Sequence, residues 1–367
     1  MTAPAGWTPD LLAQLDGYAE TIANWGRWGP DDQLGTLNLL TPQRRVAAAA
    51  LVRTGTCLGL GRRIGGSPTP DNPVPPLQHM LATGEAARAR GGSHASDWLG
   101  LAPHGFAVTH VDAFSHQFFD AAMYNGRPAG LVTAATGAAA GSVEAFADGI
   151  VGRGVLLDLP RVYRRPWLEP GEAVHPPDLD AAAAAQETEV RPGDILFVRV
   201  GRDARAERHG RLDPITAGSP GLAAGCLPWL RQHDIALLGS DAQSDQMRAG
   251  GAPHPVPIHA GALVLLGLPL LDNAWLEDLA AACATEGRWE FLAVICPLRL
   301  RRATGSAVNP VAVLLGGARS RGRRGRIRVC TRHGPFGMGI GRNGGLAGTG
   351  RCRTYGRRRG RAGPLLL

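Results

Sequence analysis

The sequence predicts an α/β or α+β fold in which one mixed sheet or barrel is packed by helices. Short apolar runs bounded by glycine and proline recur along residues 1–315, and segments of helical periodicity lie between several of them. Alternating strands and helices of this kind bury their apolar faces on each other in layered cores. With 367 residues, 44% of them hydrophobic, the chain can bury a large core without a disulfide framework.

The first predicted elements are two helices, over residues 9–24 and 42–52. Thr41 can cap the second helix, and Pro42 suits its first turn. A turn-rich loop, GPDDQLGTLNLLT, lies between the two helices. Residues 65–96 then form a stretch rich in proline, glycine and small residues, which is long enough to be a lid.

The remaining elements are short strands and three further helices. Seven apolar runs are predicted as strands: GTCLGLGRRI, GFAVTHVDAF, RGVLLDLPRV, GDILFVRVG, DIALLGSD, LPLLDNA and FLAVICPLRL. Helices are predicted over residues 178–188, 222–233 and 257–266. No stretch approaches the roughly 20 apolar residues that span a bilayer, and the N-terminus lacks a signal-type pattern, so no membrane contact is predicted. Six scattered cysteines without a CxxC pair favour a reducing cytoplasm.

The positive charge is concentrated at the C-terminal end. All 39 basic residues are arginines, and 14 of them lie between Arg319 and Arg361, where no acidic residue occurs. The other 25 arginines face 31 acidic residues, so the body is mildly acidic and nucleic-acid binding is not expected of it. Residues 316–367 are predicted to be a disordered Arg/Gly-rich tail outside the 1–315 domain. We interpret this tail as a frameshift or read-through product of a GC-rich gene; the alternative is an arm that binds nucleic acid.

The string THVDAFSH, residues 109–116, carries the clearest chemical pattern. On an extended strand, residues two apart project to one face, so His110 and Asp112 point the same way. A converging imidazole and carboxylate suit a divalent metal such as zinc or manganese. His116 follows four residues later, where it can sit beside the metal as a general acid or base.

Two ligands cannot hold a catalytic ion, so others must come from elsewhere in the chain. His259 begins a predicted helix that is followed by the strand LPLLD. About eight helical residues rise roughly 12 Å and the returning strand covers a similar distance, which brings Asp272 back to the level of His259. His254 is a further candidate on the adjoining loop.

Each of these residues also has a purely structural interpretation. His110 and Asp112 can form a hydrogen-bonded surface pair, and His259 can be a satisfied buried imidazole. Asp272 can belong to a turn or cap the next helix. Pocket and turn roles are both open for three residues of LLGSDAQSD: Asp241, Ser244 and Asp245. The other histidines are predicted to be solvated: those at 79, 94, 104, 175, 209 and 233.

The same string resembles the motif of the cyclase-like metal-dependent hydrolases, a family that includes kynurenine formamidase and isatin hydrolase. The resemblance covers most of residues 1–315 and rests on WGRWGPDDQLGTLN, THVDAFSH, MYNGRP, LLGSDAQSD and ATGSAVNPVAVL. In that family the motif His-x-Gly-Thr-His-x-Asp-x-x-x-His supplies metal ligands from its first two histidines and its aspartate. Its last histidine transfers protons. The resemblance implies the swivelling β/β/α fold of these proteins.

Carried over to this chain, the resemblance assigns metal ligation to His110 and Asp112 and proton transfer to His116. It places the downstream ligands on His259 and on Asp272, where formamidases have Glu. It also implies a homodimer or homotetramer.

Two positions depart from the family motif. Phe106 stands in the place of the first histidine, and Val108 in the place of the glycine. The loss of one ligand predicts a single bound metal, and Phe106 in the wall of the site predicts a substrate more hydrophobic than N-formylkynurenine. Tyr124, Asn125 and Arg127, from MYNGRP, either orient that substrate or build a turn.

Together these features predict a metal-dependent hydrolase of a small aromatic or hydrophobic metabolite. It would cleave an amide, lactam, lactone or ester bond with metal-activated water and His116 as proton shuttle. One alternative is a metal-dependent cyclase or lyase of polyketide-type secondary metabolism. The alternative from another class is a nucleic-acid-binding protein that acts through residues 316–367.

Overall fold

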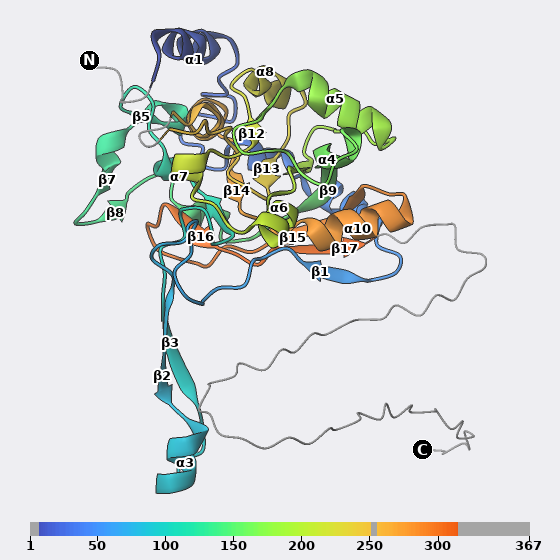
Figure 1. Cartoon of the computed structure of the whole chain (residues 1–367). Helices are drawn as coiled ribbons and strands as arrows, with labels where there is room; N and C mark the ends of the chain where they lie inside the picture. The colour runs from blue at the N-terminus through green and yellow to red at the C-terminus, as the bar shows by residue number, and fades with distance from the viewer. Residues whose placement is uncertain (1–6, 251–254, 315–367) are drawn as a thin grey trace, which may run out of the picture. The chain divides into compact units, whose positions relative to one another are not determined.

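A nine-stranded, strongly curled mixed sheet forms the centre of the fold in the computed structural model, which describes residues 7–250 and 255–314 (Figure 1). Its strands, in spatial order, are β1 (Cys57–Gly59), β17 (Val311–Leu314), β15 (Glu290–Ile295), β9 (Ile150–Asp158), β11 (Ile195–Arg199), β13 (Leu237–Ser240), β14 (Leu270–Asp272), β4 (His110–Asp112) and β16 (Gly305–Ala307). The predicted mixed sheet packed by helices is confirmed.

The middle of the sheet is parallel and its two flanks are antiparallel. Strands β9, β11, β13 and β14 pair in parallel, whereas β1, β17 and β15 on one side and β4 and β16 on the other pair antiparallel. Every residue of β11 is buried, as expected for a parallel strand covered on both faces. This explains why ILFV, the run before Arg199, is continuously apolar rather than alternating.

Helices pack on both the parallel and the antiparallel strands. The helices outside the hairpin described below are α1 (Pro9–Thr21), α2 (Pro42–Ala49), α4 (Leu159–Val162), α5 (Pro176–Ala185), α6 (Arg202–His209), α7 (Pro214–Ala217), α8 (Cys226–Gln232), α9 (Pro257–His259) and α10 (Glu277–Glu286). Helix α2 packs against β9 and β15, and α5 packs against β9. The predicted cap of α2 is present, because the Thr41 hydroxyl accepts a hydrogen bond from the Arg44 amide at 3.3 Å.

The helix predicted over residues 257–266 is present, but most of it is a π-helix. α9 leads directly into η6 (Ala260–Leu266), whose residues are all buried. Gly267 ends this helix in the left-handed conformation, with φ +59°. A Cβ at this position would lie 2.4 Å from the Tyr124 ring, so both the backbone angle and the close packing require glycine.

Residues 65–96, predicted as a lid loop, instead contain most of a β-hairpin. Strands β2 (Leu77–Ala82) and β3 (Ser96–Gly100) pair antiparallel, and α3 (Gly84–Arg90) lies at the tip (Figure 1). The expectation of a loop over these residues was therefore wrong, and a lid role stays a prediction. The strand predicted over residues 105–114 is also shorter than expected, since only His110–Asp112 pair in the sheet.

Several short elements complete the described chain. Three two-residue ladders join β5 (Ala122–Met123) to β6 (Arg127–Pro128), β7 (Val132–Thr133) to β8 (Gly137–Ala138) and β10 (Ala173–Val174) to β12 (Gly221–Leu222). Five 3-10 turns lie at η1 (Gly35–Leu39), η2 (Phe114–His116), η3 (Tyr124–Gly126), η4 (Ala129–Leu131) and η5 (Val143–Phe146).

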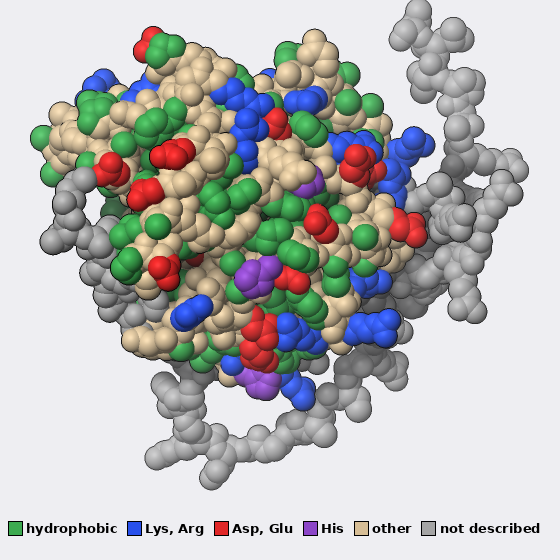
Figure 2. All heavy atoms as spheres, turned by 90° about the horizontal axis from the view of Figure 1, so that it is seen from above, with side chains coloured by type: hydrophobic (Ala, Val, Ile, Leu, Met, Phe, Trp, Pro, Cys, Tyr) green, Lys and Arg blue, Asp and Glu red, His purple; other side chains and the backbone are tan. Residues whose placement is uncertain are grey.

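The described surface carries both signs of charge. On the face seen in Figure 2, arginine and acidic side chains lie intermixed among apolar ones. Within residues 7–250 and 255–314, no helix has both the length and the apolar character needed to cross a membrane. The predicted tail, residues 316–367, and the candidate His254 lie outside the described residues.

Candidate metal centre

Strand β4 places His110 and Asp112 side by side in the interior. Its neighbours on the two sides are β14, in which Asp272 is paired with His110, and β16. His110 and Asp112 are only 2% and 0% exposed, and His110 Nε2 lies 3.4 Å from Asp112 Oδ1. The period-2 argument from the sequence therefore places these two groups correctly, but in the core rather than on a surface strand.

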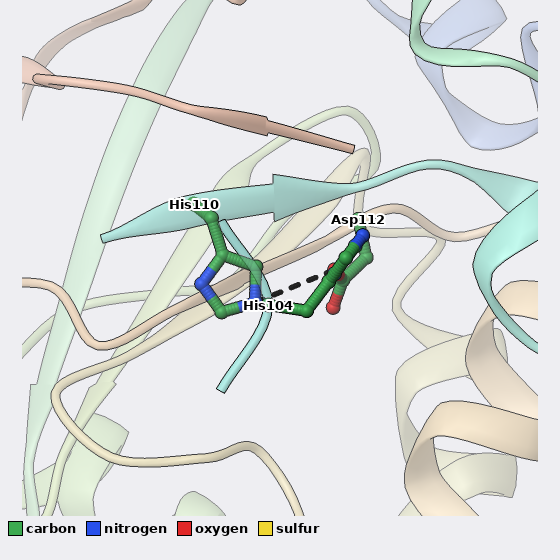
Figure 3. A group of neighbouring side chains, drawn as sticks. All are labelled: His104, His110 and Asp112. Carbon is green, nitrogen blue, oxygen red and sulfur yellow. Dashed lines mark hydrogen bonds and ion pairs between the residues drawn. The ribbon is translucent and has the colours of Figure 1, made fainter. Parts of the chain in front are cut away.

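His104 joins the same site, although the sequence predicted it to be solvated. Its Nδ1 lies 2.7 Å from Asp112 Oδ1, and its Nε2 lies 2.9 Å from the Thr304 hydroxyl (Figure 3). Its ring stacks on that of His116, with centroids 3.8 Å apart. The only signal in the sequence was a histidine two positions before Phe106, in a segment where strand periodicity does not hold.

The second predicted pair, His259 and Asp272, also lies at this site. His259 Nε2 lies 3.5 Å from Asp112 Oδ2 and 3.5 Å from Asp272 Oδ2. The strand that follows the helix thus returns Asp272 to His259, as predicted. All three side chains are buried.

A further set of acceptors fixes the orientation of these ligand-type groups. Asp245 Oδ2 lies 2.5 Å from His259 Nδ1, and the Val108 carbonyl lies 2.8 Å from His110 Nδ1. Because each Nδ1 is held this way, the Nε2 atoms of both rings point toward Asp112. Ser244 donates both its hydroxyl and its amide to Asp272 Oδ1.

Of the three polar residues of LLGSDAQSD, two belong to this outer layer. Ser244 and Asp245 support the cluster, whereas Asp241 accepts the amides of Val200 and Gly201 and shapes a backbone turn. The sequence left both roles open for all three.

The electrostatics of the cluster keep its central carboxylate ionised. Burial acts to raise the pKa of Asp112, but the surrounding imidazoles, His110 foremost, hold it well below its ordinary value. Burial acts to lower the pKa of His259, yet the carboxylates around it raise that pKa well above its usual value. Burial, together with the charge of Asp112, raises the pKa of Asp272. The ionised Asp112 carboxylate is in the state that a metal ligand requires, whereas His259 must lose its Nε2 proton before it can coordinate an ion.

The donor set fits a divalent cation. Two overlapping groups of side chains have ligand atoms within 4.8 Å of one another: His104, His110 and Asp112 form one, and Asp112, His116 and His259 form the other. Asp112 Oδ2 is buried and has no hydrogen-bond partner among the described residues. A buried carboxylate oxygen without a partner is costly unless a cation coordinates it. Imidazole and carboxylate ligands suit zinc and manganese alike.

His116 and His104 are the two histidines of the cluster with access to solvent. Their side chains are 27% and 26% exposed, whereas those of His110 and His259 are 3% and 6% exposed. His116 Nε2 lies 4.0 Å from Asp112 Oδ1. This position suits proton transfer, as the sequence predicted, and it also allows ligation.

The residues of MYNGRP form their hydrogen bonds away from the cluster. Asn125 donates to the carbonyls of Gly29 and Pro30 and accepts the Gly26 amide at 2.7 Å. Arg127 donates to the carbonyls of Asp32 and Pro30, and the Tyr124 hydroxyl donates to the Asp32 carboxylate at 3.1 Å. The structure therefore brings these side chains to the loop at residues 26–32, and a substrate contact for them stays a prediction.

We expect Asn125 to act on stability rather than on substrate affinity. Replacing Asn125 with alanine removes four hydrogen bonds and leaves φ +66° to a residue that disfavours it, which should cost about 2 kcal/mol of unfolding free energy. Asn125→Gly keeps the backbone angle and isolates the hydrogen bonds. Denaturant melts and KM values check this; a raised KM with unchanged stability would instead support substrate binding.

Phe106, the other predicted substrate contact, lies beside the cluster. It lines a cavity of about 470 Å³ together with His104, Leu77 and Trp98. This cavity joins the base of the hairpin to the edge of the histidine cluster. Its apolar lining is compatible with the predicted hydrophobic substrate.

Fold and site together define a mixed α/β protein with a buried His/Asp candidate metal centre. The chain belongs to the putative cyclase family, whose model matches residues 69–245. It is 33% identical to a novel cyclase of known crystal structure, with a TM-score of 0.72 over 80% of this chain and 100% of that one. No curated protein matches the chain.

More distant structures share the fold. An isatin hydrolase bound to the product analogue thioisatinate is 17% identical, with a TM-score of 0.52 over 75% of this chain and 99% of that one. Isatin hydrolase A from Ralstonia solanacearum is also 17% identical, with a TM-score of 0.51 over 75% of this chain and 97% of that one. Family membership and the His/Asp cluster together suggest an enzyme with a divalent metal.

The outer shell of the centre yields a prediction of its own. Asp245→Asn replaces the acceptor on His259 Nδ1 and frees that ring to turn, so metal affinity should fall about 10- to 100-fold. Competition with a fluorescent chelator measures this affinity. Asp241→Asn is the matched control, because Asp241 is equally buried but its carboxylate bonds backbone amides rather than a ligand histidine. Equal affinity in Asp245→Asn and the wild type would contradict the orienting role.

Proposed function

We propose that this protein is a metal-dependent hydrolase of an amide, lactam, lactone or ester in a small aromatic or hydrophobic metabolite. The observation that carries the proposal is the convergence of imidazoles on Asp112, whose Oδ2 is buried without a hydrogen bond from any described residue. An isatin hydrolase has a similar fold, which supports hydrolysis as one reaction of this architecture.

Four predicted residues would hold the ion: His110, Asp112, His259 and Asp272. His104 adds a donor of the same kind on the solvent side of Asp112. A bound zinc or manganese ion supplies Lewis acidity and lowers the pKa of a coordinated water toward neutrality.

The chain's own groups account for the proton movements. His116 is partly exposed and, in the ion's absence, its pKa is lowered to about 4, first by burial and then by the charges of the neighbouring imidazoles. His116 is therefore neutral at physiological pH and can accept a proton from the attacking water. It can then deliver this proton to the leaving nitrogen or oxygen as the carbonyl–heteroatom bond breaks.

The cavity beside the cluster supports the substrate class. Phe106, Trp98 and Leu101 line it, and His104 forms its boundary with the cluster. An aromatic or aliphatic body can pack on these groups while its carbonyl faces the cluster.

Metal analysis of the purified protein, followed by an assay panel, tests the proposal. We expect a stoichiometric divalent metal, loss of hydrolysis on chelation, and recovery with zinc or manganese. The panel contains an aryl formamide, a lactam, a lactone and an aryl ester. A pure, folded protein without metal, or one whose hydrolysis survives chelation, would overturn the proposal. Solvent-deuterium incorporation without hydrolysis would favour the cyclase or lyase alternative.

A further inference from the structure

A second cavity, of about 690 Å³, lies beside the candidate metal centre, and no histidine or aspartate of the metal cluster lines it. It is lined by the glycine-rich segment that follows β1 and by residues from three other parts of the chain. Its volume is that of a small-molecule site. It shares Ala107 and Val108 with the cavity that contains His104, so the two cavities adjoin along this short segment.

Arg62, in the wall of this second cavity, has buried hydrogen-bond donors without acceptors. Its side chain is 5% exposed, and its Nη2 donates to Asp203 at 2.7 Å and to the Asp241 carbonyl at 2.5 Å. Its Nε and Nη1 are buried with no hydrogen-bond partner in the described part of the chain. Unpaired buried guanidinium nitrogens are costly, and an anion that enters beside Arg62 would supply the missing acceptor once the side chain turns toward the cavity.

The charges around Arg62 favour an anion. Arg63 and Arg211 also line the cavity, so its lining contains three arginines and two carboxylates, those of Asp203 and Asp278. Asp203 is already paired with Arg62, and Asp278 accepts the Trp275 indole N–H at 3.0 Å. Of the described residues, none forms an ion pair with Arg63.

A neighbouring arginine responds to the same excess of positive charge. Burial, followed by the charge of Arg62, lowers the pKa of Arg202 to about 10, even though Asp71 lies 2.7 Å from its Nη2. Asp71 is shared between Arg202 and Arg211, so a single carboxylate serves two guanidinium groups here. The wall thus has more cationic donors than acceptors.

The rest of the lining is apolar and partly aromatic. Trp275, Ile64, Pro76 and Val108 line the cavity with the arginines. Trp275 is partly exposed, and its N–H is already engaged with Asp278, so its ring can contact a flat apolar body. A ligand that satisfies both kinds of lining combines an aromatic ring with one anionic group.

We propose that this cavity is a binding site for a small aromatic carboxylate, with Arg62 as the anionic anchor and Trp275 as the stacking surface. The site is separate from the metal cluster and does not depend on the proposed reaction. Val108 connects the two physically, because it lines the cavity and its carbonyl also holds His110 Nδ1.

Calorimetric titration of the metal-loaded protein with benzoate tests this site, with neutral benzamide as the matched ligand. Benzoate should bind at least about 10-fold more tightly than benzamide, since only the carboxylate forms charge-assisted hydrogen bonds. The double variant Arg62→Gln/Asp203→Asn removes the anchor without leaving Asp203 unpaired, and should weaken benzoate at least about 10-fold. Arg45→Ser, which changes an exposed arginine on α2, should leave the affinity unchanged.

Two further variants keep the test decisive. His110→Ala removes a metal-cluster residue and should retain benzoate binding, which separates this site from direct binding to the metal. Trp275→Ala should weaken benzoate even if the double variant does not fold. Undetectable benzoate binding at millimolar concentration would overturn the proposal. So would unchanged binding in the folded double variant or in Trp275→Ala, or binding lost in His110→Ala.

Discussion

Replacing Asp112 with asparagine should abolish metal binding and turnover together. Asp112 is the one residue common to both possible ligand groups, and it lies within 4.0 Å of four imidazole nitrogens from His104, His110, His116 and His259. The substitution preserves size but removes the negative charge at the centre of the cluster. We expect kcat/KM to fall by about 10³-fold or more, because the metal supplies several kcal/mol of barrier reduction.

Elemental analysis and kinetics on the same folded preparation measure this effect. Asp158→Asn is a suitable control, since Asp158 is also a buried carboxylate at the end of a strand but pairs with Arg199 at 2.7 Å. The control should lose stability and keep its metal. Full metal content and normal turnover in folded Asp112→Asn would show that the ion, if any, binds elsewhere.

The parts of the site that the sequence could predict are those set by regular geometry. His110 and Asp112 share a face because β4 is extended, and a strand has a two-residue period whatever its surroundings. Asp272 returns to His259 because a helix and the strand after it cover similar distances. That argument survives the change from an α-helix to a π-helix, since it depends only on the chain reversing over a similar height.

His104 could not be predicted in this way, because its position depends on distant residues. It lies in a segment without regular structure, between β3 and β4. Asn273 donates to the carbonyls of Gly105 and Val108, and Thr304 bonds the His104 ring, so groups about 160 to 200 residues away fix the segment. The imidazole missing at Phe106 thus has a counterpart two residues earlier. The prediction that the site lacks one histidine therefore needs revision, because His104 supplies an imidazole there. The number of bound ions stays a prediction.

The hairpin of residues 77–100 escaped prediction for a different reason. Strand assignment relied on apolar runs that become buried, whereas every residue of β2 except its last is exposed. Its pairing comes instead from cross-strand contacts such as the stacked His79 and Trp98 rings, with centroids 6.0 Å apart. Such contacts leave little periodic signal in a sequence rich in proline and small residues.

His116→Ala should separate catalysis from metal binding. Of the four imidazoles around Asp112, that of His116 lies farthest from the carboxylate, with Nε2 4.0 Å from Oδ1, and its removal leaves the other donors in place. We expect the metal content to stay at the wild-type level and kcat to fall about 10²- to 10⁴-fold, the usual contribution of a positioned proton carrier. Added imidazole should restore part of the rate.

The pH dependence of kcat/KM tests the role of His116 independently. With a pKa lowered to about 4, His116 stays neutral as the pH falls from 7 toward 5, and it loses its ability to accept a proton only below that range. A nearby cation disfavours the protonated ring further, so the acid limb of kcat/KM in the wild type should lie well below the usual pKa of histidine. In His116→Ala, this fall of kcat/KM at low pH should disappear while the metal remains bound. If metal and activity are lost in equal measure, His116 belongs to the ligand set, and the proton must then be carried by another group.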